Sequence, residues 1–400
     1  MISTGCRGST ACLPGWKQVS DLSSVVGTGA APDGDEDAIV GMIIALKAVE
    51  NDSPRPVWYD DIYDWTESSC TQFLVDNTIV SSTGSHRLLK LGSCWGGWEM
   101  EGNNPSYHAP GHYRMMRDFQ ADYSGSRSYS LPNFGMPLTD AWNNLIDTSY
   151  KFLETTQCPD TGLVPNWALV KEDDWETLSK YPGSFSGSGT PQYEFGSEAS
   201  RTMWRVAFDA AMYPNEAGSQ ARKFLSPLQT MMVSKFDPSP LNGWSYYDES
   251  TLQGCDHVST VFESWQFNGF IFGPVYSVLV SHITEDAFQG KSFTQQNMID
   301  ISCDIVSEIP ESVSYFARSW QVISTMTLNG DIGRIGKLFR GLATSAPTTS
   351  LQPSKSQTSS PTYSPTLSKE PTPGPTGEYC GNLKEGPQNM LGIFFAGGQY

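Results

Sequence analysis

Residues 31–46, APDGDEDAIVGMIIAL, decide the fold that this sequence predicts. Acidic side chains crowd the start of this stretch, where the dipole of a helix favours negative charge. Apolar residues then recur at i, i+3, i+4 and i+7, which is the pattern of one buried helical face: Ile39, Met42, Ile43 and Leu46. The segment 51–54, which ends in Pro54, would terminate this helix because proline cannot continue it.

Helical patterns recur along the chain. We expect further helices at about 58–75, 108–119, 138–156, 198–212, 217–234, 259–283, 293–308 and 312–328. Strand patterns are scarce, and we expect one short hairpin, from Thr78 to Ser82 and from Leu88 to Leu91. Many helices joined by long, aromatic-bearing loops indicate an all-α toroid rather than a coiled-coil bundle.

The composition changes after Ala343. Ser, Thr and Pro dominate residues 344–376, and such a stretch cannot bury enough apolar surface to offset the entropy lost on ordering. We therefore expect a folded domain at 1–343 and a disordered linker at 344–376. Residues 377–400 would begin a further module or form a short docking tail.

The formal net charge of −18 excludes some partners. Phosphates repel an acidic protein, so we expect no nucleic acid and no anionic membrane as a partner. The charge and the sequon Asn51-Asp52-Ser53 fit a secreted protein that acts on a neutral or cationic polymer, and an acidity that only keeps the protein soluble is an equal alternative. Residues 1–32 contain no apolar run typical of a signal peptide. We expect a monomer.

The eight cysteines do not predict a metal site. None forms a CxxC pair, which argues against a zinc ribbon. In an oxidising compartment the even number would permit disulfides, but the spacing leaves their pairing open, and isolated buried thiols are an equal alternative. His108 and His112 are separated by Pro110-Gly111, which breaks the helix that a zinc pair would need. We expect neither a metal nor a cofactor.

Five segments, in order, carry a resemblance to glycoside hydrolase family 8. Residues 31–38 resemble its Ala-Ser/Thr-Asp-Gly/Ala-Asp helix start, although Pro32 departs from the usual Ser or Thr. Residues 104–107 are similar to its Asn-Pro-Ser-Tyr loop, and residues 162–167 to its Gly-Leu-Val-Pro-Asp-Trp, with Asn166 in place of Asp. Residues 198–202 resemble its Asp-Ala-x-Arg-Thr segment, and residues 315–331 its closing helix. The resemblance covers residues 15–340 and implies an all-α (α/α)6 toroid, incomplete at its N-terminus.

The resemblance also implies roles for two carboxylates. In that family the first Asp of the helix start binds and distorts the sugar at the cleavage point, a role that falls to Asp33. The family inverts configuration, with two carboxyl groups roughly 6.5–9.5 Å apart, and Glu198 stands where its base is an Asp. Arg201, one turn later, would pair with Glu198. The alternatives are that both acids merely cap their helices, or that the base lies elsewhere.

The general acid is a separate question. In the family it is a Glu upstream of the Asp-Gly-Asp helix, whereas residues 1–32 contain no Glu and only Asp21. We expect the acid, and a signal peptide, in sequence upstream of Met1. The alternative is a complete chain that cannot protonate a leaving group.

These residues together predict an inverting, endo-acting hydrolase of a β-1,4-linked polysaccharide, most simply a glucan. Besides Asp33 and Glu198, the expected substrate-binding residues are Asp35, Trp95, Tyr107, Trp167 and Arg201, although core packing explains each aromatic ring equally well. The main alternative is a non-catalytic glycan-binding protein on a degenerate glycosidase fold. A weaker one is a helical-toroid enzyme of another kind, such as a polysaccharide lyase.

Overall fold

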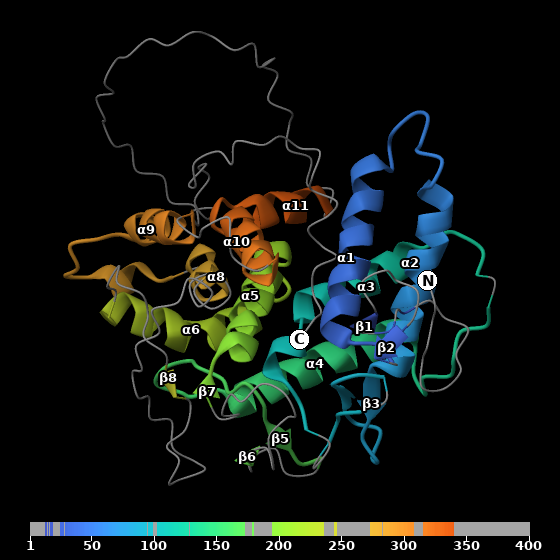
Figure 1. Cartoon of the computed structure of the whole chain (residues 1–400), viewed down its shortest axis with the longest axis horizontal. Coiled ribbons are helices and arrows are strands. Elements are labelled where there is room, and N and C mark those ends of the chain that lie inside the picture. The colour runs from blue at the N-terminus through green and yellow to red at the C-terminus, as the bar shows by residue number, and fades with distance from the viewer. Residues whose placement is uncertain are drawn as a thin grey trace.

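The structure is a computed structural model, and its described part is mostly helical (Figure 1). It describes residues 29–93, 95–98, 102–127, 129–172, 194–235, 273–281, 283–307 and 315–339. Short pieces are also described at 13, 15, 17–18, 25–27, 178–179 and 244–245. The expected linker at 344–376 and the segment 377–400 lie outside the described residues, so the predicted domain boundaries stay predictions.

The described α-helices follow the sequence pattern closely. They are α1 (Pro32–Val49), α2 (Tyr59–Asp76), α3 (Pro110–Asp122), α4 (Leu138–Thr156), α5 (Ser197–Met212), α6 (Gly218–Lys235), α8 (Gly273–Tyr276), α9 (Gln295–Ser307), α10 (Tyr315–Leu328) and α11 (Asp331–Phe339). Three short 3-10 helices are η2 (Pro105–Tyr107), η4 (Ser277–Val280) and η5 (Glu285–Phe288). The predicted helix at 138–156 has the bounds that we expected.

One helix prediction is tested only at its end, because residues 259–272 lie outside the described residues, and one helix was missed. The described end of the predicted helix at 259–283 is one turn of α8 followed by η4, because a short apolar run such as 275–280 does not by its periodicity define one long helix. We did not predict α11, which follows directly after Gly330, a residue with φ of 75° that ends α10. Glycines at 333 and 336 weaken the local helical signal of α11.

Strands are minor elements. The predicted hairpin is present as β3 (Thr78–Val80) paired with β4 (Arg87–Leu89), antiparallel and in register. Three pairs of very short strands were not predicted: β1 (Lys17–Gln18) with β2 (Val25–Gly27), β5 (Leu169–Val170) with β6 (Leu178–Ser179), and β7 (Glu194–Phe195) with β8 (Trp244–Ser245). Two- and three-residue strands are too short to produce an alternating pattern.

Consecutive helices pair in space. The pairs α1 with α2, α3 with α4, and α5 with α6 are in contact, and α3 also contacts both α1 and α5. Ion pairs join α1 to α5. η2, which directly precedes α3, contacts both α1 and α5. The N-terminal ends of α1, α3 and α5 therefore meet at one end of the molecule, and their C-terminal ends line a common hollow at the other.

The core fixes these pairs with aromatic side chains. Phe73 of α2 and Trp142 of α4 stack at 6.3 Å between ring centroids, and Tyr113 of α3 lies 5.9 Å from Phe73. Cys158 and Cys303 each take part in a disulfide bond, as an oxidising compartment would permit, whereas Cys70 is a buried free thiol. No helix in the described part of the chain is both long enough and apolar enough to cross a membrane.

Candidate active site

The first turns of α1 and α5 bring two acidic residues together around one arginine. Pro32 occupies the first turn of α1, where its missing N–H costs no hydrogen bond, and Asp33 follows it. Glu198 lies in the first turn of α5, and Arg201 follows one turn later. Arg201 Nη1 donates to Asp33 Oδ2 at 2.9 Å, and its Nη2 donates to Glu198 Oε2. One guanidinium thus joins two carboxylates that are 165 positions apart in the sequence.

Glu198 is held in place from a second direction. Asn104 Nδ2 donates to Glu198 Oε2 at 2.7 Å. The Asn104 amide is itself oriented, because its Oδ1 accepts the backbone N–H of Ser106 at 2.8 Å. The side chain of Glu198 remains 21% exposed. Within the described part of the chain its hydrogen bonds are made through Oε2, so Oε1 is the oxygen available to a ligand.

Two predicted aromatic residues lie against this cluster. The guanidinium of Arg201 lies 5.7 Å from the centre of the Tyr107 ring, and Tyr107 meets Trp167 edge-to-face at 6.2 Å. Burial raises the pKa of Tyr107 well above its ordinary value, and the neighbouring carboxylates of Asp33 and Glu198 add to that rise. Tyr107 therefore keeps its phenolic proton and can donate a hydrogen bond.

Asp33 lies in the most confined part of the cluster. Only 6% of the residue is exposed, and burial raises its carboxyl pKa above the ordinary value. Arg201 opposes this rise, whereas the negative charge of Glu198 adds to it. The remaining oxygen, Oδ1, accepts the backbone N–H of Gly34 at 3.0 Å. The carboxyl group thus has a fixed orientation.

A second ion-pair cluster lies one helical turn further along α1 and α5. Arg205 is almost fully buried, and its Nη2 donates to Asp37 Oδ2 at 3.1 Å. Against the opposing effect of burial, Arg205 and His112 lower the pKa of Asp37 to about 2. Glu36 is also buried here, 3.3 Å from Arg205. This cluster ties α1 to α5 beneath the first one.

The other two predicted residues lie away from the Arg201 pair. The carboxyl of Asp35 is turned toward Asn77, whose Nδ2 donates to it at 3.0 Å, and the residue is 3% exposed. Trp95 is half-buried and packs its ring onto Gly92. Its loop is joined to the start of α1, because Ser93 N donates to the carbonyl oxygen of Ala30 at 3.2 Å. No described contact joins either side chain to Asp33 or Glu198.

We predict that Asp35→Asn stabilises the folded protein at high pH. Burial raises the pKa of Asp35 well above its ordinary value, and Asp33 and Asp76 raise it further, against the Asn77 hydrogen bond. The folded state therefore binds this proton more tightly than the unfolded state. Protonation of Asp35 therefore adds to the free energy of unfolding below about pH 4, and this stabilisation is lost as the pH rises through the raised pKa.

Asn at position 35 keeps an acceptor oxygen for Asn77 but carries no charge. Urea unfolding should show a gain on the order of 1 kcal/mol at pH 8 over the parent, and a smaller gain at pH 5. Asp140→Asn, an exposed acid in the first turn of α4, is the control and should show no such gain. A variant at position 35 that is less stable than the parent at pH 8 would contradict the assignment.

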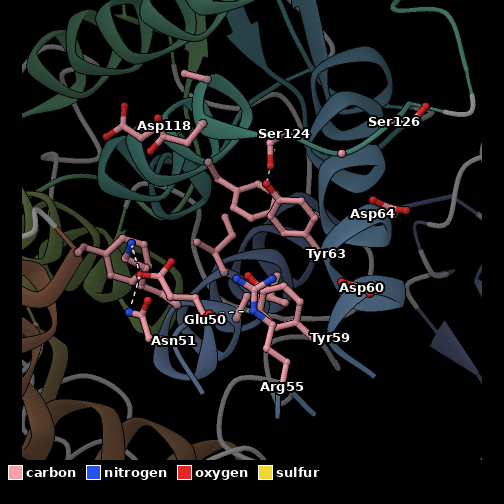
Figure 2. A pocket seen from close by; sticks show the side chains of 18 of the residues that line it. Glu50, Asn51, Arg55, Tyr59, Asp60, Tyr63, Asp64, Asp118, Ser124 and Ser126 are labelled. Carbon is pink, nitrogen blue, oxygen red and sulfur yellow. Dashed lines mark hydrogen bonds and ion pairs between the residues drawn. The ribbon is translucent and has the colours of Figure 1, made fainter. Parts of the chain in front are cut away.

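A hollow of about 900 Å³ lies at the opposite end of the molecule, where the C-terminal ends of α1, α3 and α5 meet (Figure 2). Its wall carries two stacked tyrosines, Tyr59 and Tyr63, at 5.9 Å, and Tyr63 stacks in turn on Tyr123 at 4.9 Å. Arg55 and Arg127 cover the two outer rings, at 4.6 Å and 5.1 Å. Arginines thus lie over these tyrosine rings, as Arg201 lies over the ring of Tyr107.

The described residues contain no group of three or more His, Cys, Asp or Glu side chains arranged to hold a metal ion. His108 instead lies between Ser149 and Asn103, at 2.9 Å and 3.0 Å. Burial lowers its pKa to about 3, so this histidine is neutral and serves packing.

Sequence comparison places the cluster in a known context. The model of glycosyl hydrolases family 8 matches residues 7–242. The chain is similar to Endoglucanase 2 of Ruminiclostridium josui, 28% identical over 185 residues that cover 46% of this chain and 31% of that protein. It is also similar to Endoglucanase A of Acetivibrio thermocellus, 26% identical over 203 residues that cover 48% and 32%. The chain thus spans less than a third of the length of these curated relatives.

Solved structures show the same fold. The apo β-1,3-1,4-glucanase from Paenibacillus sp. X4 aligns with a TM-score of 0.56 at 16% identity, over 80% of this chain and 71% of that one. Rex8A from Paenibacillus barcinonensis, complexed with xylose, aligns with a TM-score of 0.52 at 16% identity, over 78% and 69%. At this identity the likeness concerns the fold alone.

Proposed function

Because the chain belongs to glycosyl hydrolases family 8, we propose that it hydrolyses internal bonds of a β-1,4-linked polysaccharide with inversion of configuration. The observation that supports this most directly is the bridge from Arg201 to both Asp33 and Glu198. It places two carboxylates of different exposure side by side, next to two aromatic rings. That combination suits a sugar ring held for attack by water.

Glu198 is the proposed general base. Arg201 and Asn104 hold Oε2, which leaves Oε1 to accept a proton from a water molecule that attacks the anomeric carbon. Arg201 places a positive charge directly beside this carboxylate. Relative to Asp, the additional methylene of Glu extends the reach by about 1.5 Å, and the Asn104 contact fixes that longer side chain.

Asp33 is the proposed sugar-positioning residue. Its carboxyl is confined by Arg201 and Gly34, so a hydroxyl of the sugar would meet an acceptor of fixed direction. Tyr107 and Trp167 would offer hydrogen bonding and an apolar surface at the same place, and Trp95 would extend the binding surface. The endoglucanase names of the curated relatives favour a glucan as substrate.

The proton donor for the leaving oxygen is proposed to be a third carboxyl. Asp33 and Glu198 are both engaged by Arg201, and the scheme already gives each of them another role. The expectation that this acid lies outside the 400 residues remains part of the proposal. The closed (α/α)6 ring, secretion and a monomeric state are also parts of the proposal.

The test is hydrolysis of a soluble β-glucan by a protein that also carries the proposed upstream acid, which is the parent in every activity test below. Hydrolysis is read by released reducing ends and by proton NMR of the first product. Inversion of a β-linkage predicts that the α-anomer appears first. Early β-anomer, or an unsaturated sugar that absorbs in the ultraviolet, would contradict the proposal. A second function, glycan binding without catalysis, is favoured by the double engagement of Glu198 Oε2. Oligosaccharide binding with no released ends would support it.

We predict that Asp33→Asn lowers kcat/KM on soluble β-glucan by about 100-fold. The substitution removes the charge that Arg201 orients and weakens the acceptor for the sugar hydroxyl. The control is Asp147→Asn, an exposed acid of α4, which should keep the activity of the parent. Full activity of the position-33 variant would remove Asp33 from the mechanism.

A further inference from the structure

The first turn of α5, which carries Glu198, is capped from a distant segment. Gly196 occupies the N-cap position and has no side chain to accept the unpaired N–H groups of that turn. Asn166 Oδ1 accepts the backbone N–H of Gly196 at 3.1 Å and that of Ala199 at 2.9 Å. Asn166 is 2% exposed. A buried amide thirty positions earlier thus takes the place of an N-cap side chain.

Glycine at position 196 is required by space. A Cβ atom there would lie 2.9 Å from Asn166 Nδ2 and 3.2 Å from Asn166 Oδ1. The amide of Asn166 could not then keep its present position. The glycine and the asparagine therefore form one fitted pair.

The same segment also holds the second partner of Glu198. Ala168 and Asn103 exchange backbone hydrogen bonds at 2.9 Å and 3.0 Å. Asn104, the next residue, donates its side-chain amide to Glu198. Residues 166–168 thus hold both α5 and the loop that contacts its carboxylate, and Trp167 lies between these two attachments.

We propose that Asn166 is a positioning residue for Glu198, and that residues 166–168 couple this carboxylate to the aromatic surface of Trp167. This inference rests on the proposed function, in which Glu198 activates water. Asn166 contacts neither water nor sugar in that scheme. It acts through Gly196 and Ala199, which set the direction of the first turn of α5.

The test compares Asn166→Ala with Asn166→Asp on soluble β-glucan. Ala removes the cap, so kcat should fall by about 10–100-fold while KM changes by less than about threefold. Asp keeps an acceptor oxygen for both N–H groups, so it should recover most of kcat at high pH. Its added negative charge beside Glu198 and Asp33 should move the acid limb of the rate profile to higher pH.

Asn144→Ala is the matched control. Asn144 Oδ1 likewise accepts a distant backbone N–H, that of Arg87 at 2.6 Å, but it lies away from the cluster. We expect kcat of this variant to stay within about twofold of the parent. The inference would be overturned if Asn144→Ala and Asn166→Ala lost kcat equally, or if Asn166→Ala left kcat unchanged.

Amide hydrogen exchange separates this inference from the proposed function. If the parent binds oligosaccharide but releases no reducing ends, the catalytic proposal fails and the cap is judged by exchange alone. Asn166→Ala should then speed exchange at Gly196 and Ala199, and Asn166→Asp should restore the exchange rates of the parent. Unchanged exchange at these two amides would overturn the inference whatever the activity.

Discussion

Glu198→Gln will lower kcat on soluble β-glucan by about 10²–10⁴-fold and leave oligosaccharide affinity within about threefold of the parent. Gln preserves the length of the side chain, so its carbonyl oxygen can still accept from Arg201 and Asn104. An amide cannot take a proton from water, however, so the chemical step loses its base. Initial rates and isothermal titration with a cello-oligosaccharide measure the two quantities separately.

The control for this substitution is Glu154→Gln. Glu154 also lies in an ion pair, with Lys223 at 2.6 Å, but on the exposed surface of α4. Its loss should change neither kcat nor affinity. Unchanged turnover in the Glu198 variant would place the base at another residue and leave Glu198 as a helix N-terminal acid.

Arg201→Met is expected to destabilise the folded protein by about 3–5 kcal/mol and to abolish turnover. The guanidinium is 6% exposed and pairs with both carboxylates. Without it, Asp33 and Glu198 face each other as unpaired like charges in a confined place. Urea unfolding at several pH values and initial rates are the measurements.

The pH dependence identifies the cause. Loss of Arg201 removes an influence that lowers the pKa of Asp33, so this pKa rises further above that of the unfolded chain. Stability should therefore recover as the pH falls through the raised pKa and decline again as the pH rises.

Further variants separate charge from volume. The double variant Arg201→Met/Asp33→Asn should regain part of the stability at neutral pH. Arg334→Met removes an exposed arginine paired with Asp331 and should cost no more than about 1 kcal/mol. A position-201 variant whose stability loss does not depend on pH would contradict the electrostatic explanation.

Local sequence patterns predicted the helices well and their packing poorly. The apolar periodicity of residues 138–156 is strong, and α4 has those bounds. The apolar run that ends in α8 and η4 has no such periodicity, and packing decides its form. Gly273 there lies so close to α10 that a Cβ atom would be 2.5 Å from Ser324 Oγ. A contact between segments about fifty positions apart leaves no local signal.

The candidate site shows the same division. Asp33, Tyr107, Trp167, Glu198 and Arg201 were selected from motifs, and the structure gathers them around one guanidinium. Asn104 and Asn166 lay inside the same motifs, but we assigned them no role. Their contacts with α5 depend on tertiary packing across 94 and 30 positions. The sequence shows Asn166 where the family motif has Asp, but the role of this residue became clear only from the position of Gly196 in the structure.

The shared direction of α1, α3 and α5 gives the molecule an electrical polarity. Each helix places the equivalent of roughly half a positive charge at its N-terminal end and half a negative charge at its C-terminal end. Three positive ends point at the Arg201 cluster, where they replace part of the hydration that its carboxylates lose. Three negative ends point at the far hollow, which already carries Glu50, Asp118 and Asp122. Although the net charge is −18, the cost of holding carboxylates therefore differs between the two ends of these helices, and it is lower at the Arg201 cluster than at the hollow.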